Sequence, residues 1–160
     1  MVCERNEQIC ECDDYPLMSF VQDVGVIPKG DRYDRSFLVK DEKKIYKKTK
    51  LGDFIYSSNN LESGSIGVNN TGNAVISPVY SIFSSRNGRE SQFIGILSKR
   101  KDFINKMIHY RQGVVYGQWR IHEKDFLNIL ILTPVMNEQD KIIKFFKDLD
   151  NLITLHLRVP

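Results

Sequence analysis

Cationic, amide and aromatic side chains gather in three loops of the chain, at 31–35, 57–60 and 111–120. Arginine forms paired hydrogen bonds with guanine, asparagine and glutamine pair with adenine, and lysine mostly meets phosphate. The candidate base-reading residues are Arg32, Arg35, Ser58, Asn59, Asn60, Arg111, Tyr116, Gln118 and Arg120. The candidate phosphate contacts are Lys47, Lys48, Lys99, Arg100 and Lys101. These residue types predict a DNA-contacting surface; the alternative for each position is an ordinary solvated side chain.

Trp119 is the only tryptophan and lies between Gln118 and Arg120. Stacking on a base or sugar is one role open to it. Most tryptophans are structural, however, because their large rings bury well. We therefore favour a core or loop-anchoring role for Trp119.

The sequence favours neither catalysis nor metal binding. Three cysteines, Cys3, Cys10 and Cys12, fall within the first twelve residues without the spacing of a zinc site. His109 and His122 have no nucleophile at a motif spacing. We expect free thiols near the N-terminus and a noncatalytic chain that holds no metal and no cofactor of its own.

Length and composition indicate one folded domain with an appendage. The chain has 160 residues, of which 27% are charged and 41% hydrophobic, ordinary values for a soluble globular protein. The net charge of +3 is compatible with a polyanionic partner without requiring one. The start lacks the apolar stretch of a signal peptide, and no apolar run is long enough to span a membrane. We expect a cytoplasmic protein.

Apolar runs bounded by turn residues predict the elements that carry these loops. Short strands are expected at 15–21, 51–56, 65–68 and 74–83, the last two forming a hairpin across 69–73. Spacings of three and four over 91–108 predict an amphipathic helix or a broken pair of helices. Residues 126–132 are apolar throughout, which predicts a strand buried on both faces.

The C-terminal segment predicts a helix that needs a packing partner. Asn137 is the expected N-cap, with acidic residues in the first turn that complement the helix dipole. Apolar residues then recur with a seven-residue rhythm typical of a coiled coil or bundle. The expected docking seam consists of Ile142, Phe145, Phe146, Leu149, Leu152, Ile153 and Leu157. The alternative is a helix folded back on its own domain.

Several of these segments together resemble the DNA-specificity subunits of type I restriction-modification systems. The likeness covers nearly the whole chain and depends on the order of its motifs, not on any one of them. These are GVIP at 25–28, KLGDFIY at 50–56, GSIGV at 64–68, ISPVY at 76–80, QWRI at 118–121 and EQDKI at 138–142, with Pro134, Leu149 and Asp150.

The resemblance implies an α/β fold: a compact target-recognition domain of short mixed strands with small helices, followed by a C-terminal coiled-coil-type helix. We expect the recognition domain at 1–134 and a truncated spacer helix at 135–160. In that family the specificity subunit is noncatalytic and recruits a nuclease/translocase subunit and a methyltransferase subunit, which binds S-adenosylmethionine. A full subunit has two recognition domains, so the resemblance implies a half subunit, a fragment or an incomplete cassette.

The implied partners are double-stranded DNA, the two catalytic subunits, and a second copy or specificity half that pairs through the C-terminal helix. An alternative is a truncated assembly module that binds partner subunits through its helix without reading DNA. A third hypothesis is an enzyme with a small-molecule pocket.

Overall fold

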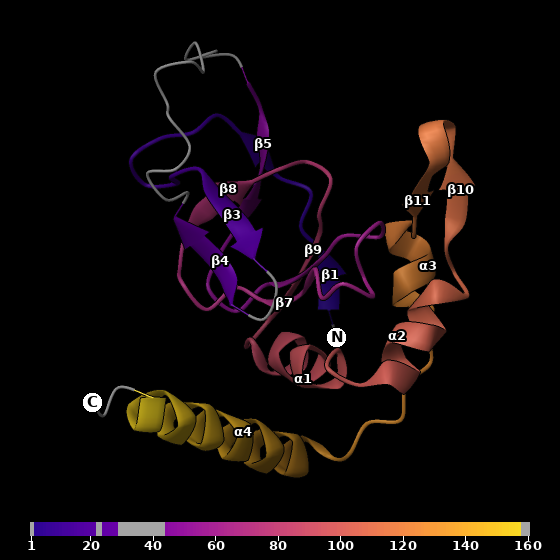
Figure 1. Cartoon of the computed structure of the whole chain (residues 1–160). Helices are drawn as coiled ribbons and strands as arrows, with labels where there is room; N and C mark the ends of the chain where they lie inside the picture. The colour runs from indigo at the N-terminus through magenta and orange to yellow at the C-terminus, as the bar shows by residue number, and fades with distance from the viewer. Residues whose placement is uncertain (1, 22–23, 29–43, 158–160) are drawn as a thin grey trace.

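The computed structural model describes residues 2–21, 24–28 and 44–157. Across these residues, short strands form several small sheets, small helices follow them, and a long helix comes last (Figure 1). The expected mixed α/β fold with a long C-terminal helix is confirmed at this level. Within the described part of the chain, no helix combines the length and the apolar character that crossing a membrane requires.

The largest sheet is antiparallel and lies between two apolar cores. Its strands, in spatial order, are β1 (Val2–Glu4), β9 (Ser81–Ser85), β6 (Phe54–Tyr56) and β7 (Ile66–Val68). Side chains alternate between the two faces of a strand. Phe54 and Tyr56 therefore enter one core, where they meet the Phe126 ring at centroid distances of 5.7 and 5.1 Å. Ile55 enters the other core together with Phe20 and Val26.

Two smaller sheets cover the second core. The first has the order β2 (Gln8–Ile9), β5 (Tyr46–Thr49) and β8 (Ala74–Ile76), and the second pairs β3 (Met18–Val21) with β4 (Gly25–Pro28). The expected hairpin over 65–83 is wrong, because β7 pairs with β6 and β8 pairs with β5. The turn at 69–73 connects two sheets, and the Asn69 amide stabilises it by donating to the Gly72 carbonyl oxygen at 2.7 Å.

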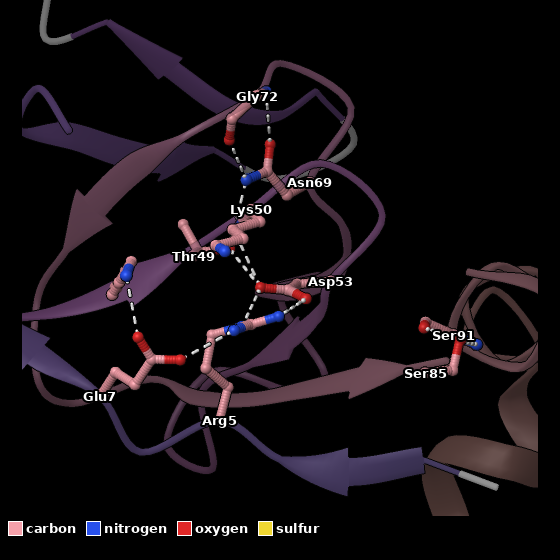
Figure 2. Close-up of polar contacts among 10 residues, drawn as sticks. Arg5, Glu7, Thr49, Lys50, Asp53, Asn69, Gly72, Ser85 and Ser91 are labelled. Atoms are coloured by element: carbon pink, nitrogen blue, oxygen red, sulfur yellow. Dashed lines mark hydrogen bonds and ion pairs between the residues drawn. The ribbon is translucent and has the colours of Figure 1, made fainter. Parts of the chain in front are cut away.

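A polar network joins the largest sheet to the β2–β5–β8 sheet (Figure 2). The guanidinium of Arg5, just after β1, donates from Nε to Asp53 Oδ2 at 2.7 Å and from Nη2 to Asp53 Oδ1 at 3.2 Å. Asp53 also accepts from the Thr49 hydroxyl at 3.3 Å and from the Lys50 backbone N–H at 2.8 Å. Glu7 links Arg5 to Lys48 through bonds of 3.0 and 2.8 Å. These bonds satisfy a carboxylate that is almost fully buried.

The broken helix pair predicted over 91–108 is confirmed as α1 (Arg89–Leu97) and α2 (Lys101–Ile108). α1 packs closely on β7 at Gly95. A Cβ atom at Gly95 would collide with the Val68 side chain. Glycine at this position is thus required by the close approach of helix and strand.

We expect Gly95→Ala to lower the free energy of unfolding by about 1–3 kcal/mol, the usual cost of overpacking a core. Adding Val68→Ala makes room, so the double variant should lose less than the sum of the two single changes. Urea denaturation measures all three variants. Alanine is intrinsically better than glycine in a helix by about 1 kcal/mol, so a net gain in the stability of Gly95→Ala would contradict the close packing.

The strand expected over 126–132 is wrong. A short helix, α3 (Glu123–Leu127), places Phe126 in the core, and the chain then runs without regular structure to α4. Ile129 and Ile131 pack against the core, whereas Leu130 and Leu132 are 89% and 98% exposed. Apolar density predicted burial on both faces, but within the described chain only one face of this segment is covered.

The C-terminal helix is confirmed as α4 (Met136–Leu157). It begins one residue before Asn137, so the expected N-cap is wrong, and the Gln139 amide donates to the Pro134 carbonyl at 2.9 Å. Its first half packs on α1 through buried Ile143 and an ion pair from Arg89 Nε to Asp140 Oδ1 at 2.5 Å. Figure 1 shows its second half extending past α1.

The predicted seam residues of α4 divide between these two halves. Ile142 and Phe146 are half-buried, whereas the others face solvent: Phe145, Leu149, Leu152, Ile153 and Leu157. Ile143, which the predicted seam left out, is the buried contact, and Leu155 is a further exposed apolar residue. Among the described residues, the buried side chains of the helix, Gln139 and Ile143, therefore lie in its first half.

Candidate nucleic-acid interface

Residues 112–120 form an antiparallel hairpin that projects from the body of the molecule beside α3 (Figure 1). Its strands are β10 (Gln112–Val114) and β11 (Gln118–Arg120), joined by the 3₁₀ turn Val115–Gly117. Every residue of the hairpin is exposed. The sequence predicted an irregular loop here, and the structure replaces it with a regular two-stranded ribbon.

Side chains of the loop after β6 hold the outer edge of β11. Asn59 Oδ1 accepts the Trp119 backbone N–H at 2.6 Å, and Ser58 Oγ accepts the Ile121 backbone N–H at 2.9 Å. Ser58 is buried. Both candidates for base reading thus position the hairpin, while neighbouring Asn60 remains exposed.

Polar contacts also fix the base of the hairpin. Arg111 Nη1 pairs with Glu62 Oε2 at 2.9 Å, and the Gln112 amide donates to Asp125 Oδ2 at 3.1 Å. The Arg111 side chain is only 9% exposed, and its Nε and Nη2 atoms have no partner among the described residues. Arg111 therefore lies largely buried at the base of the hairpin.

Glu123, at the start of α3, connects the hairpin to the sheets. Its Oε1 accepts the Ser81 hydroxyl at 3.0 Å and lies 3.9 Å from Lys47 Nζ, and its Oε2 lies 3.4 Å from Arg120 Nη2. Burial raises the pKa of Glu123, but its own backbone N–H, the Ser81 hydroxyl, Arg120 and Lys47 together bring that pKa below its usual value. The charged form is thus favoured by folding, and this contribution to stability is lost as the pH falls through the lowered pKa.

The register of the hairpin divides its side chains between two faces. Gln112 pairs with Arg120, Gly113 with Trp119 and Val114 with Gln118. Because alternate residues share a face, Gln118 and Arg120 lie on one face and Trp119 on the other. The amide and the guanidinium that suit base edges are therefore adjacent on one surface of the ribbon.

Aromatic side chains are exposed at the tip and on the opposite face. Tyr116, in the turn, is 95% exposed. Trp119 is 49% exposed, and a Cβ atom at Gly113 would be 3.9 Å from its ring. A core role for Trp119 is therefore wrong, whereas the loop-anchoring role, the other interpretation favoured from the sequence, stays a prediction. Side chains alternate between the two faces of the projecting ribbon, so one side of the Trp119 ring is exposed to solvent.

The remaining candidates lie apart from the hairpin. Lys99 and Arg100 lie in the turn between α1 and α2, and Lys101 is the first residue of α2. All three are at the other end of α2 from the hairpin and so about 12 Å away along its axis. Lys48 pairs with Glu7 and lies over the Tyr15 ring at 4.7 Å. Arg32 and Arg35 lie outside the described residues.

The structure adds acidic residues to the site that the sequence did not single out: Glu62, Glu123 and Asp125. Their partners lie as far as 49 residues away in sequence, as for Arg111 and Glu62. No local pattern marks a pair so far apart in the sequence. Carboxylates scattered among lysines look the same on any surface.

Comparison with known proteins found no matching family model and no similar curated protein. Among the described residues, no group of three or more histidine, cysteine or acidic side chains is placed to hold a metal ion. Cys3, Cys10 and Cys12 are free and exposed. What the site offers chemically is hydrogen bonding and stacking from a projecting, anchored ribbon.

Proposed function

We propose that the chain recognises a short sequence of double-stranded DNA, as a noncatalytic specificity subunit or half subunit of a type I restriction-modification complex. The observation that carries the proposal is the anchored hairpin 112–120, with exposed amide, guanidinium and aromatic side chains. A two-stranded ribbon fits the major groove of B-form DNA, where each base pair presents a distinct pattern of donors and acceptors.

Gln118 and Arg120 are the side chains of the ribbon best suited to reading bases. Gln118 is exposed and sits next to the turn, and its amide matches the donor and acceptor of adenine. Arg120 is half exposed, and its contact with Glu123, at 3.4 Å, is long. A guanine edge offers the guanidinium two hydrogen bonds, so Arg120 can exchange this contact for a stronger one.

The turn between α1 and α2 supplies the proposed phosphate contacts. Lys99 and Lys101 are exposed, and within the described chain no acidic side chain pairs with either of them. Arg100 is exposed and forms an ion pair with Asp102, with Nη2 and Oδ2 2.7 Å apart. Lysines of this kind add sequence-independent, salt-dependent affinity.

Replacing Lys99 and Lys101 together by alanine should weaken binding to all duplexes alike. Each lost phosphate contact lowers the slope of log K against log salt by about 0.9, so we expect a decrease of about 2. Fluorescence anisotropy over a range of salt concentrations measures it. Lys141→Ala with Lys144→Ala, on α4, removes the same charge as a control, and an equal decrease there would contradict a local phosphate site.

α4 supports the assembly part of the proposal. The exposed apolar side chains on its second half suit pairing with a second helix, from another copy or another specificity half. In a complex of this type the methyltransferase subunit supplies the bound S-adenosylmethionine and the nuclease subunit supplies cleavage. The chain itself then contributes recognition and docking.

The exposed apolar side chains of α4 also favour a second function, that of an assembly module that binds partners through α4 without reading DNA. Leu149→Lys tests the helix pairing that both accounts require, because a charge in the exposed apolar stripe should abolish it in either case. Changes in the hairpin distinguish the two accounts. If changes in the hairpin then leave the DNA binding of the assembled complex unaltered, the assembly module is the better account. Analytical ultracentrifugation and DNA binding are measured on the same variants.

A further inference from the structure

Tyr116, at the tip of the hairpin, has an unusual backbone conformation. Its φ is 63° and its ψ is 30°, and it is the only residue other than glycine with positive φ among the described residues. Glycine, asparagine and aspartate are the usual choices for such a position, because a Cβ atom is disfavoured there. Gly117, which follows with φ 70°, shows the ordinary solution.

No contact within the described chain compensates for this conformation. The Tyr116 side chain is almost completely exposed, as is much of Val115 beside it. A large aromatic ring is therefore exposed to solvent at a position where glycine or asparagine would cause less backbone strain. A strained residue of this kind, held out by the fold, is typical of functional sites.

The hairpin beneath the tip is fixed on both of its strands. Gln112, at the start of β10, donates to Asp125, and the backbone of Trp119 and Ile121 donates to the side chains of Asn59 and Ser58. The three residue pairs between β10 and β11 carry this constraint up to Val114 and Gln118. The tip is consequently presented at the end of a stiff support.

We propose that the tip is a wedge: Tyr116, supported by Val115, inserts between two stacked base pairs of the bound duplex and deforms it. This inference rests on the proposed DNA-recognition function and adds the way in which the site reads sequence. Apolar and aromatic side chains that unstack a step bend the DNA, and pyrimidine–purine steps such as TA and CA yield most easily. The wedge thus selects a flexible step beside the bases that Gln118 and Arg120 contact.

The experiment uses the chain assembled with its methyltransferase subunit and the duplex most enriched in a random-sequence selection. 2-Aminopurine, placed at successive positions of that duplex, becomes fluorescent where a base is unstacked. We expect a severalfold rise at one pyrimidine–purine step, lost in Tyr116→Gly and kept in Tyr116→Phe. Glycine accepts the positive φ, so this change removes the ring without disturbing the turn.

Each other outcome overturns the wedge. Specific binding with no tip-dependent rise would leave sequence recognition intact and exclude the wedge alone. A Tyr116→Gly variant that loses the methyltransferase subunit but still deforms DNA would assign the tip to a protein contact. Failure to select any preferred duplex would instead exclude DNA recognition and the wedge together. Tyr110→Ala, at the other end of the hairpin, serves as the aromatic control and should leave the signal unchanged.

Discussion

Replacing Asp53 by alanine should lower the free energy of unfolding by about 2–4 kcal/mol. Removing one member of a buried ion pair leaves the other charge without compensation, which typically costs about 3–5 kcal/mol. The side chains of Arg5 and Asp53 are 16% and 3% exposed, so water screens part of this cost. Arg5 also keeps Glu7 as a partner at 3.0 Å, which offsets a further part. The change also removes the acceptor for the Thr49 hydroxyl and the Lys50 backbone N–H.

Urea denaturation of the unaltered protein and of Asp53→Ala measures the difference in their free energies of unfolding. Asp102→Ala is the matched control, because its pair with Arg100 is made at nearly the same distance, 2.7 Å, but the two side chains are 60% and 63% exposed. Exposed pairs contribute little to stability. Equal midpoints for Asp53→Ala and Asp102→Ala would show that the network in Figure 2 does not hold the sheets together.

Replacing Gln118 and Arg120 together by alanine should remove most of the preference for the specific DNA site. A good paired contact with a base contributes about 1–3 kcal/mol of discrimination, so two contribute about 2–6 kcal/mol, or roughly 30-fold to more than 10⁴-fold. Binding to random DNA should change little, because the lysines at the α1–α2 turn remain.

The measurement is a competition between the specific duplex and random DNA at a fixed salt concentration. Arg120→Ala leaves Glu123 with Ser81 and Lys47 as partners, so thermal unfolding is checked in parallel. Gln8→Ala with Arg86→Ala, which removes the same side-chain types from exposed positions outside the hairpin, is the control and should preserve discrimination. An unchanged ratio of specific to random binding in the double variant would remove the ribbon from sequence reading.

Local patterns predicted many elements of this fold. Apolar residues at 91–108 and after 136 recur at the helical repeat, because a helix that buries one face needs an apolar side chain at each turn. The predicted strand at 126–132 was wrong because apolar density has no period and cannot distinguish a strand from a helix turn followed by an extended segment. Only the packing of Phe126 against β6 and β9 decides between them.

The pairing of β7 and β8 could not be predicted from the sequence, for a different reason. β7 and β8 follow each other across a short turn, which favours a hairpin. Hydrogen bonds of Asn69 and the polar network around Asp53 instead stabilise an arrangement in which β7 pairs with β6 and β8 pairs with β5, in different sheets. Those contacts join residues up to 48 positions apart, as for Arg5 and Asp53, and no single-sequence pattern reports them.

The candidate site was predictable in its residue types but not in the direction its side chains take. The sequence placed Tyr116, Gln118 and Arg120 in one loop, and the structure exposes all three. Ser58 and Lys47 have equally suitable polar groups, yet they turn inward to Ile121 and Glu123. Inward or outward orientation depends on partners from distant segments.

The most direct test of the central proposal is selection from a random-sequence duplex library by the chain assembled with its methyltransferase subunit. Sequence recognition through the hairpin predicts one short enriched motif, which the Gln118→Ala, Arg120→Ala double variant fails to enrich. Recovery of random sequences by the unaltered protein, at a salt concentration where it still binds DNA, would contradict the proposed function.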